Sequence, residues 1–172
     1  VPVTTLGLEE GRDYRGVNIR KEHQSFYSYD VEHKGEIIAT VHLSIPGKHN
    51  IYNSLAAFAA CHISGVAPED IAKGINAFGG AGRRFEILGT VNGVTIADDY
   101  AHHPEEITAT LNAANDMGFK RVWAVFQPFT YSRTKMLLKE FAISLQLADK
   151  VVMTEIMGSR EVNTIGIYTK DL

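Results

Sequence analysis

The second half of the chain alternates strand-like and helix-like segments, and this pattern restricts the fold more than any other feature of the sequence. Compact apolar runs occur at residues 94–98, 121–126 and 149–156, and segments with helical spacing of apolar residues separate them at 104–117 and 132–147. This order is typical of a parallel sheet wound in right-handed crossovers. We therefore predict an α/β fold in which helices cover a parallel sheet.

A hairpin is predicted directly before this pattern. Residues 85–98 contain two apolar stretches around an Asn-Gly dipeptide, which favours the type I′ turn of a tight hairpin. The glycine-rich residues 79–82 precede the hairpin and predict a flexible connection. We place a domain boundary there, so that residues 1–82 and 83–172 form two domains.

The first half predicts a small antiparallel sheet followed by two helices. Residues 16–33 and 36–43 alternate apolar and polar side chains, which is the period of half-buried strands. Helical spacing of apolar side chains then predicts helices over 50–64 and 69–78, the second opened by a proline.

Composition excludes several classes of protein. The 172 residues include 17 basic and 20 acidic side chains, a net charge of −3, so no basic surface for nucleic acid is expected. No apolar run approaches the roughly 20 residues that span a bilayer, and the first residues do not read as a signal peptide. A single cysteine, Cys61, excludes a disulfide framework and a Cys-based zinc site. We expect Cys61 to be a core residue and the protein to be cytoplasmic.

Polar side chains follow three of the predicted strands, at residues 98–104, at 127–133 and from Glu155 onward. In sheets of this kind, ligands bind beyond the carboxyl ends of the strands. The three clusters therefore predict a ligand crevice. The alternative interpretation is that Asp98 or Asp99 only caps the helix that follows.

The first of these clusters also contains side chains of the types that bind metal ions. Asp98, Asp99, His102 and His103 are suitable ligands for a divalent cation. Two neighbouring histidines, however, do not easily face one ion, and no second group of ligands is evident. We therefore predict no metal site.

A glycine-containing segment resembles the end of a phosphate-binding loop without completing one. The loop would require a glycine where His42 stands and a serine or threonine where His49 stands, around the pair Gly47-Lys48. No complete phosphate cradle is therefore expected in this chain.

Two asparagines and two arginines are further candidates for ligand binding. Asn50 and Asn53 lie three residues apart at the start of a predicted helix. Asn50 is interpreted either as the N-cap or, with Asn53, as a contact for a planar polar ligand such as a nucleobase edge. Arg84 and its neighbour Arg83 directly follow the predicted linker, as a solvated pair or as an anion clamp. Arg133 begins a helix, where it can grip a carboxylate with two parallel hydrogen bonds.

Together these motifs resemble the Mur ligases of peptidoglycan synthesis. The similarity covers about residues 45–160 and follows the order of the family's motifs, which here read IPGKHNIYNSLAAFAA, GAGRRFE, ADDYAHHPEEITATL, FQPFTYSRT and LADKVVMTEI. Within the family, the residues are most similar to the member that joins L-alanine to UDP-N-acetylmuramate with ATP, through an acyl phosphate. A sibling that recycles murein tripeptide is less similar at the FQP motif.

The resemblance implies a domain assignment. Residues 1–82 would be the C-terminal part of a central ATP-binding domain, and residues 83–172 a truncated Rossmann-like C-terminal domain. The chain would then be a fragment, inactive alone, with the phosphate loop and the Mg²⁺ ligands located upstream.

The resemblance also implies roles for particular residues. The residues that the resemblance implies bind ATP are His49, Asn50, Asn53, Arg84 and Asp99. Arg84 and Asp99 would be the catalytic pair, whose replacement is expected to reduce turnover with little change in folding. Those on the amino-acid side are Tyr100, His102 and Arg133.

The chain departs from the family at one motif. The family often has histidine after FQP, where this chain has Phe129, and the next position is Thr130 rather than a basic residue. Arg133 is therefore expected to be the main cation for the alanine carboxylate.

Two functional hypotheses remain at this point. The first is a part of such a ligase, and the second is a stand-alone module that binds a nucleotide or an anionic metabolite without chemistry. The absence of a phosphate loop favours the second for this chain alone, and the order of the motifs favours the first for a longer protein.

Overall fold

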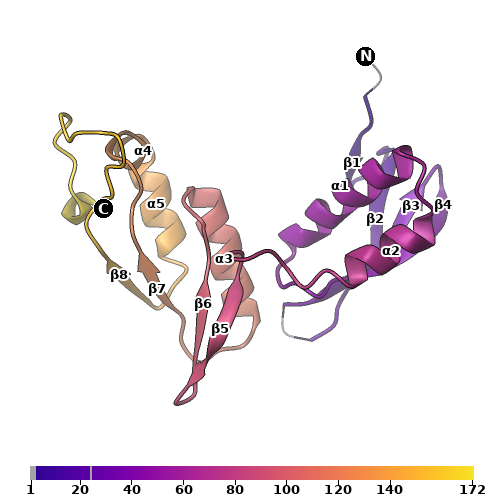
Figure 1. Cartoon of the computed structure of the whole chain (residues 1–172), viewed down its shortest axis with the longest axis horizontal. Coiled ribbons are helices and arrows are strands. Elements are labelled where there is room, and N and C mark those ends of the chain that lie inside the picture. The colour runs from indigo at the N-terminus through magenta and orange to yellow at the C-terminus, as the bar shows by residue number, and fades with distance from the viewer. Residues whose placement is uncertain (1–2, 24) are drawn as a thin grey trace. The chain divides into compact units, whose positions relative to one another are not determined.

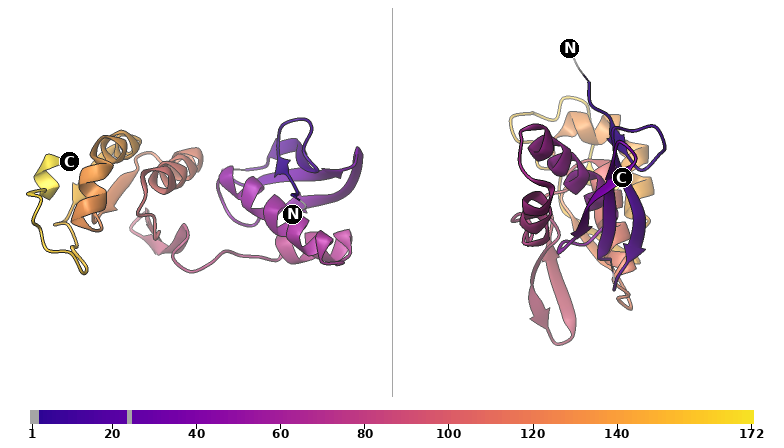
Figure 2. Two further views of the ribbon diagram at one scale, coloured as in Figure 1. Left: turned by 90° about the horizontal axis from the view of Figure 1, so that it is seen from above. Right: turned by 90° about the vertical axis from the view of Figure 1, so that its right-hand side faces the viewer.

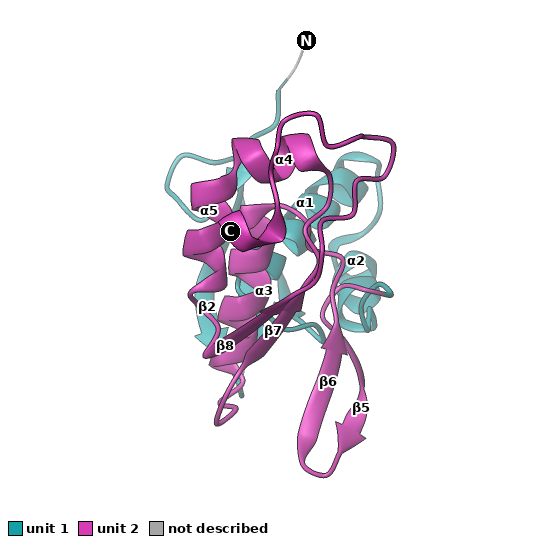
Figure 3. Ribbon diagram, turned by 90° about the vertical axis from the view of Figure 1, so that its left-hand side faces the viewer, with its two compact units in different colours: residues 1–82 teal, residues 83–172 magenta. Residues whose placement is uncertain are grey.

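A computed structural model describes residues 3–23 and 25–172. The chain divides into two compact units, residues 1–82 and residues 83–172 (Figures 1 and 3). The α/β class predicted from the sequence is confirmed, because each unit combines strands with helices.

The first unit contains a four-stranded sheet. Its strands follow one another in the order β1-β2-β3-β4, and they span Leu6–Gly7, Tyr14–Lys21, Tyr27–His33 and Glu36–His42. The short β1 runs parallel to β2, and the other pairs are antiparallel, as the alternation of side chains predicts. Register shifts interrupt both antiparallel pairs.

Two helices cover one face of this sheet, α1 (His49–Ile63) and α2 (Pro68–Asn76) (Figure 2). Fully buried side chains from both layers, among them Tyr29 of the sheet and Phe58 of α1, form one core. The Tyr29 hydroxyl lies 2.8 Å from Ser54 Oγ, and burial raises the pKa of Tyr29 to about 12, an effect that this hydrogen bond reduces. The expectation for Cys61 is wrong, because this side chain is exposed on the outer face of α1.

The second unit begins with a hairpin formed by β5 (Glu86–Val91) and β6 (Val94–Asp98). Asn92 and Gly93 both have positive φ, 50° and 80°, as the predicted type I′ turn requires. A bulge at Gly89, where φ is 154°, shifts the register of the two strands.

The parallel sheet that the sequence predicts is smaller than expected. β7 (Trp123–Phe126) pairs in parallel with β8 (Lys150–Met153), but β6 pairs only with β5 among the described residues. The expected three-stranded parallel sheet is therefore wrong, because β6 forms a hairpin with β5 and pairs with neither β7 nor β8. Two helices, α3 (Pro104–Asp116) and α5 (Leu138–Leu145), pack against β7 and β8 through a core that includes Phe126 and Phe141.

The helix predicted over 132–147 is in fact two helices. α4 (Tyr131–Met136) and α5 are separated by Leu137, whose φ and ψ of −112° and 26° lie outside the helical region. Neither proline nor glycine marks this break in the sequence. The described chain then ends in a loop and a short 3₁₀ helix, Thr169–Asp171.

One face of the parallel strands carries exposed apolar side chains. Residues that point toward α3 and α5 alternate with Trp123, Val125 and Val152, which are 57%, 74% and 44% exposed. Parallel sheets are ordinarily covered on both faces, so this open face is unusual. None of the helices in the described part of the chain has the length and apolar character needed to cross a membrane.

Candidate functional site

The polar residues of the second unit gather at the start of α3. His103 is the N-cap of this helix, because its Nδ1 accepts a hydrogen bond from the Glu105 backbone N–H at 3.4 Å. The Glu106 carboxylate reaches back to the backbone N–H groups of His102 and His103, at 3.0 and 3.2 Å. This is a capping box. The alternative interpretation of Asp98 or Asp99 as the cap is therefore wrong.

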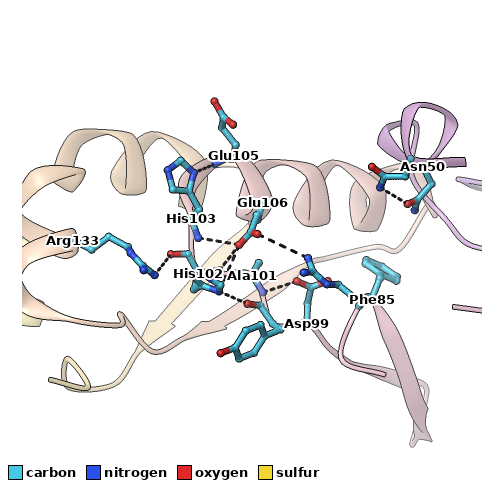
Figure 4. A network of polar contacts seen from close by, with 12 residues as sticks. Asn50, Phe85, Asp99, Ala101, His102, His103, Glu105, Glu106 and Arg133 are labelled. Carbon is cyan, nitrogen blue, oxygen red and sulfur yellow. Dashed lines mark hydrogen bonds and ion pairs between the residues drawn. The ribbon is translucent and has the colours of Figure 1, made fainter. Parts of the chain in front are cut away.

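Asp99 instead joins two backbone segments, the one that leads into β5 and the one that leads into α3. Its two carboxylate oxygens accept hydrogen bonds from the backbone N–H groups of Phe85 and Ala101, each at 2.7 Å (Figure 4). Arg83 and Phe85, the neighbours of Arg84, have φ of 58° and 47°, a region that costs free energy for residues with a side chain. Asp99 therefore has a structural role that the sequence did not predict, in addition to any contact with a ligand.

Glu106 lies between Arg84 and His102. Its carboxylate oxygens are 3.9 Å from Arg84 Nη1 and 3.7 Å from His102 Nδ1. Partial burial opposes ionisation of Glu106, but the backbone N–H of His102, the charge of that histidine, the N–H of His103 and the charge of Arg84 outweigh it. They hold the pKa of Glu106 below its ordinary value. Glu106 thus connects one residue expected at ATP to one expected at the amino acid.

Tyr100 lies beside the same network. Its backbone N–H donates to Arg83 O at 2.8 Å, and its carbonyl oxygen is 2.9 Å from His102 Nδ1. The exposed Tyr100 ring faces the edge of the His102 ring, with 5.1 Å between ring centres, and the Arg83 guanidinium lies 4.9 Å from the Tyr100 ring centre.

Arg133 joins the second polar cluster to the first. It lies in the first turn of α4, and its Nη1 is 3.4 Å from the backbone oxygen of His102 (Figure 4). Its guanidinium also lies 5.9 Å from the centre of the Phe129 ring. No carboxylate in the described part of the chain lies within salt-bridge distance of Arg133, although its charge helps to lower the pKa of Glu161.

The third cluster supports α4 rather than opening onto the site. Phe129 and Met157 form a parallel bridge, and Thr130, at φ 65°, donates its backbone N–H to Met157 O at 2.9 Å. The Glu161 carboxylate binds the Ser132 backbone N–H at 2.8 Å and the Ser132 hydroxyl. The hydroxyl and then the backbone N–H hold the pKa of Glu161 below its ordinary value. Glu161 therefore caps α4 from 29 residues away.

The candidate residues of the first unit lie at the start of α1. His49 is the first residue of the helix and Lys48 is the N-cap, so the interpretation of Asn50 as the N-cap is wrong. Asn50 Nδ2 donates to Pro46 O at 2.7 Å, and Asn53 Nδ2 donates to Asn50 Oδ1 at 3.0 Å. The Asn53 side chain is exposed.

The described residues form no cluster of metal-binding side chains. Within residues 3–23 and 25–172, no group of three or more His, Cys, Asp or Glu side chains is arranged to hold a metal ion. The segment around Gly47 also lacks the residues of a phosphate cradle. The chain therefore offers side chains for a base edge and for anionic groups, but no complete site for a nucleoside triphosphate.

Two functional candidates were missed from the sequence, Glu106 and Glu161. A signal existed for Glu106, because it follows the cap residue His103 by three positions, the spacing of a capping box. No local signal existed for Glu161, since it binds Ser132 across a loop that only the fold brings together.

Comparisons with known proteins agree with this arrangement. A family profile described as "Mur ligase middle domain" matches residues 1–61, and one described as "Mur ligase, glutamate ligase domain" matches residues 83–167. The UDP-N-acetylmuramate–L-alanine ligase of Caldanaerobacter subterraneus is 47% identical over 170 residues, which are 99% of this chain and 37% of the relative. That of Alkaliphilus metalliredigens is 48% identical over 159 residues, 92% of this chain and 35% of the relative. The chain thus spans little more than a third of the length of these relatives.

Solved structures give the same result. The UDP-N-acetylmuramate-alanine ligase of Thermotoga maritima matches with a TM-score of 0.75 and 30% identity, over 91% of this chain and 35% of that chain. A murein peptide ligase of Psychrobacter arcticus matches with a TM-score of 0.60 and 32% identity, over 87% of this chain and 31% of that chain.

Proposed function

Because the chain belongs to the Mur ligase family, we propose that it is part of an ATP-dependent ligase that joins L-alanine to UDP-N-acetylmuramate. One observation carries the proposal from the structure. Arg84, Tyr100, His102 and Arg133 are joined by polar contacts at the start of α3, with Glu106 at their centre, and Asp99 lies beside them, bonded to the backbone N–H groups of Phe85 and Ala101. The relatives at 47% and 48% identity support the choice of L-alanine as the amino acid.

The proposed reaction forms an amide in two steps. The muramoyl carboxylate receives a phosphate from ATP, which gives an acyl phosphate. The amine of L-alanine then attacks the acyl carbon, and phosphate leaves from a tetrahedral intermediate. Positioning and charge stabilisation supply most of the rate enhancement in reactions of this type.

The residues of this chain divide between the two substrates. Arg84 would stabilise the negative charge of the transferring phosphate, and Asp99 would hold the backbone that carries it. Arg133 would bind the carboxylate of L-alanine, and Tyr100 and His102 would contact the same substrate. In the first unit, His49, Asn50 and Asn53 would contact the nucleotide.

The domain assignment belongs to the same proposal. Residues 1–82 would be the C-terminal part of the central ATP-binding domain, and residues 83–172 the Rossmann-like C-terminal domain. The Mg²⁺ ligands used with ATP are expected upstream of this chain, as the resemblance to the family implies. A cytoplasmic location, predicted from the single cysteine, also remains part of the proposal.

The likeness to a murein peptide ligase favours a second candidate, in which the amino-acid site accepts a peptide. Purified full-length protein would be assayed for ATP-dependent phosphate release with UDP-N-acetylmuramate and either L-alanine or a murein peptide. Turnover with L-alanine supports the proposal, and turnover with the peptide alone supports the second candidate. The 172-residue chain alone is expected to release no phosphate, because it lacks a phosphate loop.

A further inference from the structure

The hydrogen bond between His102 and Tyr100 defines which ring nitrogen of His102 carries the proton. His102 Nδ1 lies 2.9 Å from the carbonyl oxygen of Tyr100. A carbonyl oxygen only accepts hydrogen bonds, so Nδ1 must donate and therefore carries the hydrogen. In the neutral imidazole, the lone pair is then on Nε2. The His102 side chain is 35% exposed, so a substrate can reach it.

The neighbouring His103 has the opposite arrangement. Its Nδ1 accepts the backbone N–H of Glu105, so its lone pair is used in the helix cap and Nε2 carries the hydrogen. Of the two adjacent histidines, only His102 therefore presents a basic nitrogen at the outer end of its ring. The capping box, which fixes His103, also fixes the loop that carries His102 (Figure 4).

Charged groups from three segments face His102. The Glu106 carboxylate of α3 lies 3.7 Å from Nδ1 and favours a positive charge on the ring. Arg84, which lies 3.9 Å from Glu106, and Arg133, which lies 3.4 Å from the His102 backbone oxygen, oppose that charge. In the proposed ligase, both arginines would be neutralised by substrate anions, the phosphate and the alanine carboxylate.

We propose that His102 Nε2 is the base that removes a proton from the ammonium group of the amino-acid substrate. This proposal rests on the function proposed above. Free L-alanine is protonated at neutral pH and has no lone pair with which to attack. Transfer of one ammonium proton to Nε2 gives the free amine and an imidazolium. The amine then attacks the acyl carbon, the bond from that carbon to the phosphate oxygen breaks, and the departing phosphate takes the second nitrogen proton.

Glu106 is a positioning residue in this scheme. It contacts the proton donor side of the His102 ring and the backbone N–H of the same residue, so it fixes the ring and stabilises the imidazolium that forms. It does not itself touch the amino acid. Its loss should therefore alter the pH profile of amide formation.

The test compares two nucleophiles in the full-length ligase. Hydroxylamine is largely unprotonated at neutral pH and traps an acyl phosphate as a hydroxamate without needing a base. His102→Asn keeps a side-chain N–H for the Tyr100 carbonyl but removes the basic nitrogen. We expect this variant to lose about a hundredfold or more of its rate with L-alanine, the scale of general-base catalysis, and to form hydroxamate at a near wild-type rate.

The chain provides matched controls for both residues. His103→Asn makes the same change at the adjacent residue and retains a good N-cap. This variant should therefore ligate L-alanine at the wild-type rate. Glu106→Gln should shift the acidic limb of kcat/KM for L-alanine, whereas Glu105→Gln, in the same first turn, should not. In His102→Asn, the acidic limb of kcat/KM for L-alanine should disappear. The loss of rate relative to the wild type should become smaller at alkaline pH, where the free amine of L-alanine predominates.

The outcomes separate the inference from the function on which it rests. If His102→Asn ligates L-alanine at the wild-type rate, or loses the amide and hydroxamate reactions equally, His102 is not the base and the inference is overturned. If the wild-type enzyme forms neither amide nor hydroxamate with ATP and UDP-N-acetylmuramate, the proposed function itself is wrong, and the inference falls with it.

Discussion

Asp99→Asn should destabilise the second unit, contrary to the little change in folding expected from the sequence, because it replaces one of two carboxylate oxygens that each accept a backbone N–H. In either orientation of the asparagine amide, its NH₂ group faces the N–H of Phe85 or of Ala101, both now at 2.7 Å from an oxygen. The lost bond is one to a charged group, which contributes about 1.5–3 kcal/mol to stability. Asp99 is only partly buried, so water can reach the freed N–H. We therefore expect a loss of about 1.5–2 kcal/mol in the free energy of unfolding, at the lower end of this range.

The effect is measurable in the 172-residue chain. For a unit of this size, such a change lowers the Tm on the order of 10 °C. Thermal unfolding followed by circular dichroism should show one transition moved and the other unchanged. Amide hydrogen exchange, measured by NMR, should accelerate most at Phe85 and Ala101.

Asp98→Asn is the matched control. Asp98 forms an ion pair with Arg83 at 3.1 Å, but both side chains are exposed, at 39% and 61%. Such pairs contribute about 0–1 kcal/mol, so the control should melt close to the wild type. If Asp99→Asn also melts like the wild type and the Phe85 amide exchanges at its original rate, the structural role of Asp99 is refuted.

Three further predictions concern the linker, the substrate carboxylate and acid stability. A non-specific protease should cleave first at residues 79–82 and only later within 121–156; early cleavage inside β7 or β8 would contradict the division into two units. In the full-length ligase, Arg133→Lys should raise the KM for L-alanine far more than that for ATP, because lysine cannot donate the two parallel hydrogen bonds of a guanidinium. A KM for L-alanine equal to that of the wild type would show that Arg133 does not bind the substrate carboxylate. The lowered pKa of Glu161 means that its stabilising effect is present above the ordinary carboxylate range and is lost as the pH falls through its folded value. The stability of Glu161→Gln should therefore vary less with acid pH than that of the wild type, and parallel curves would argue against this contribution.

Local signals in the sequence predicted the elements well. The Asn-Gly pair specified its turn because few residues tolerate two consecutive positive φ angles, and Asn92 and Gly93 show them. Proline marked the starts of α2 and α3 for a similar reason, since its fixed φ suits a first helical turn.

Features that depend on distant partners could not be predicted. The capping of α4 by Glu161 arises from a contact across a loop, and neither proline nor glycine marks the break at Leu137. The candidate residues of the second unit were named from the motifs, but the role of Asp99 in the backbone was not. Sequence spacing shows which residues follow a strand, and only the fold shows which atoms their side chains bind.

The open face of β7 and β8 also gives the chain an internal optical probe. Trp123 is the single tryptophan among the 172 residues, and its indole is 57% exposed on that face. An indole in water emits at longer wavelength and is quenched by acrylamide more readily than a covered one. Fluorescence of the unlabelled protein therefore reports directly when another segment or molecule packs onto these strands.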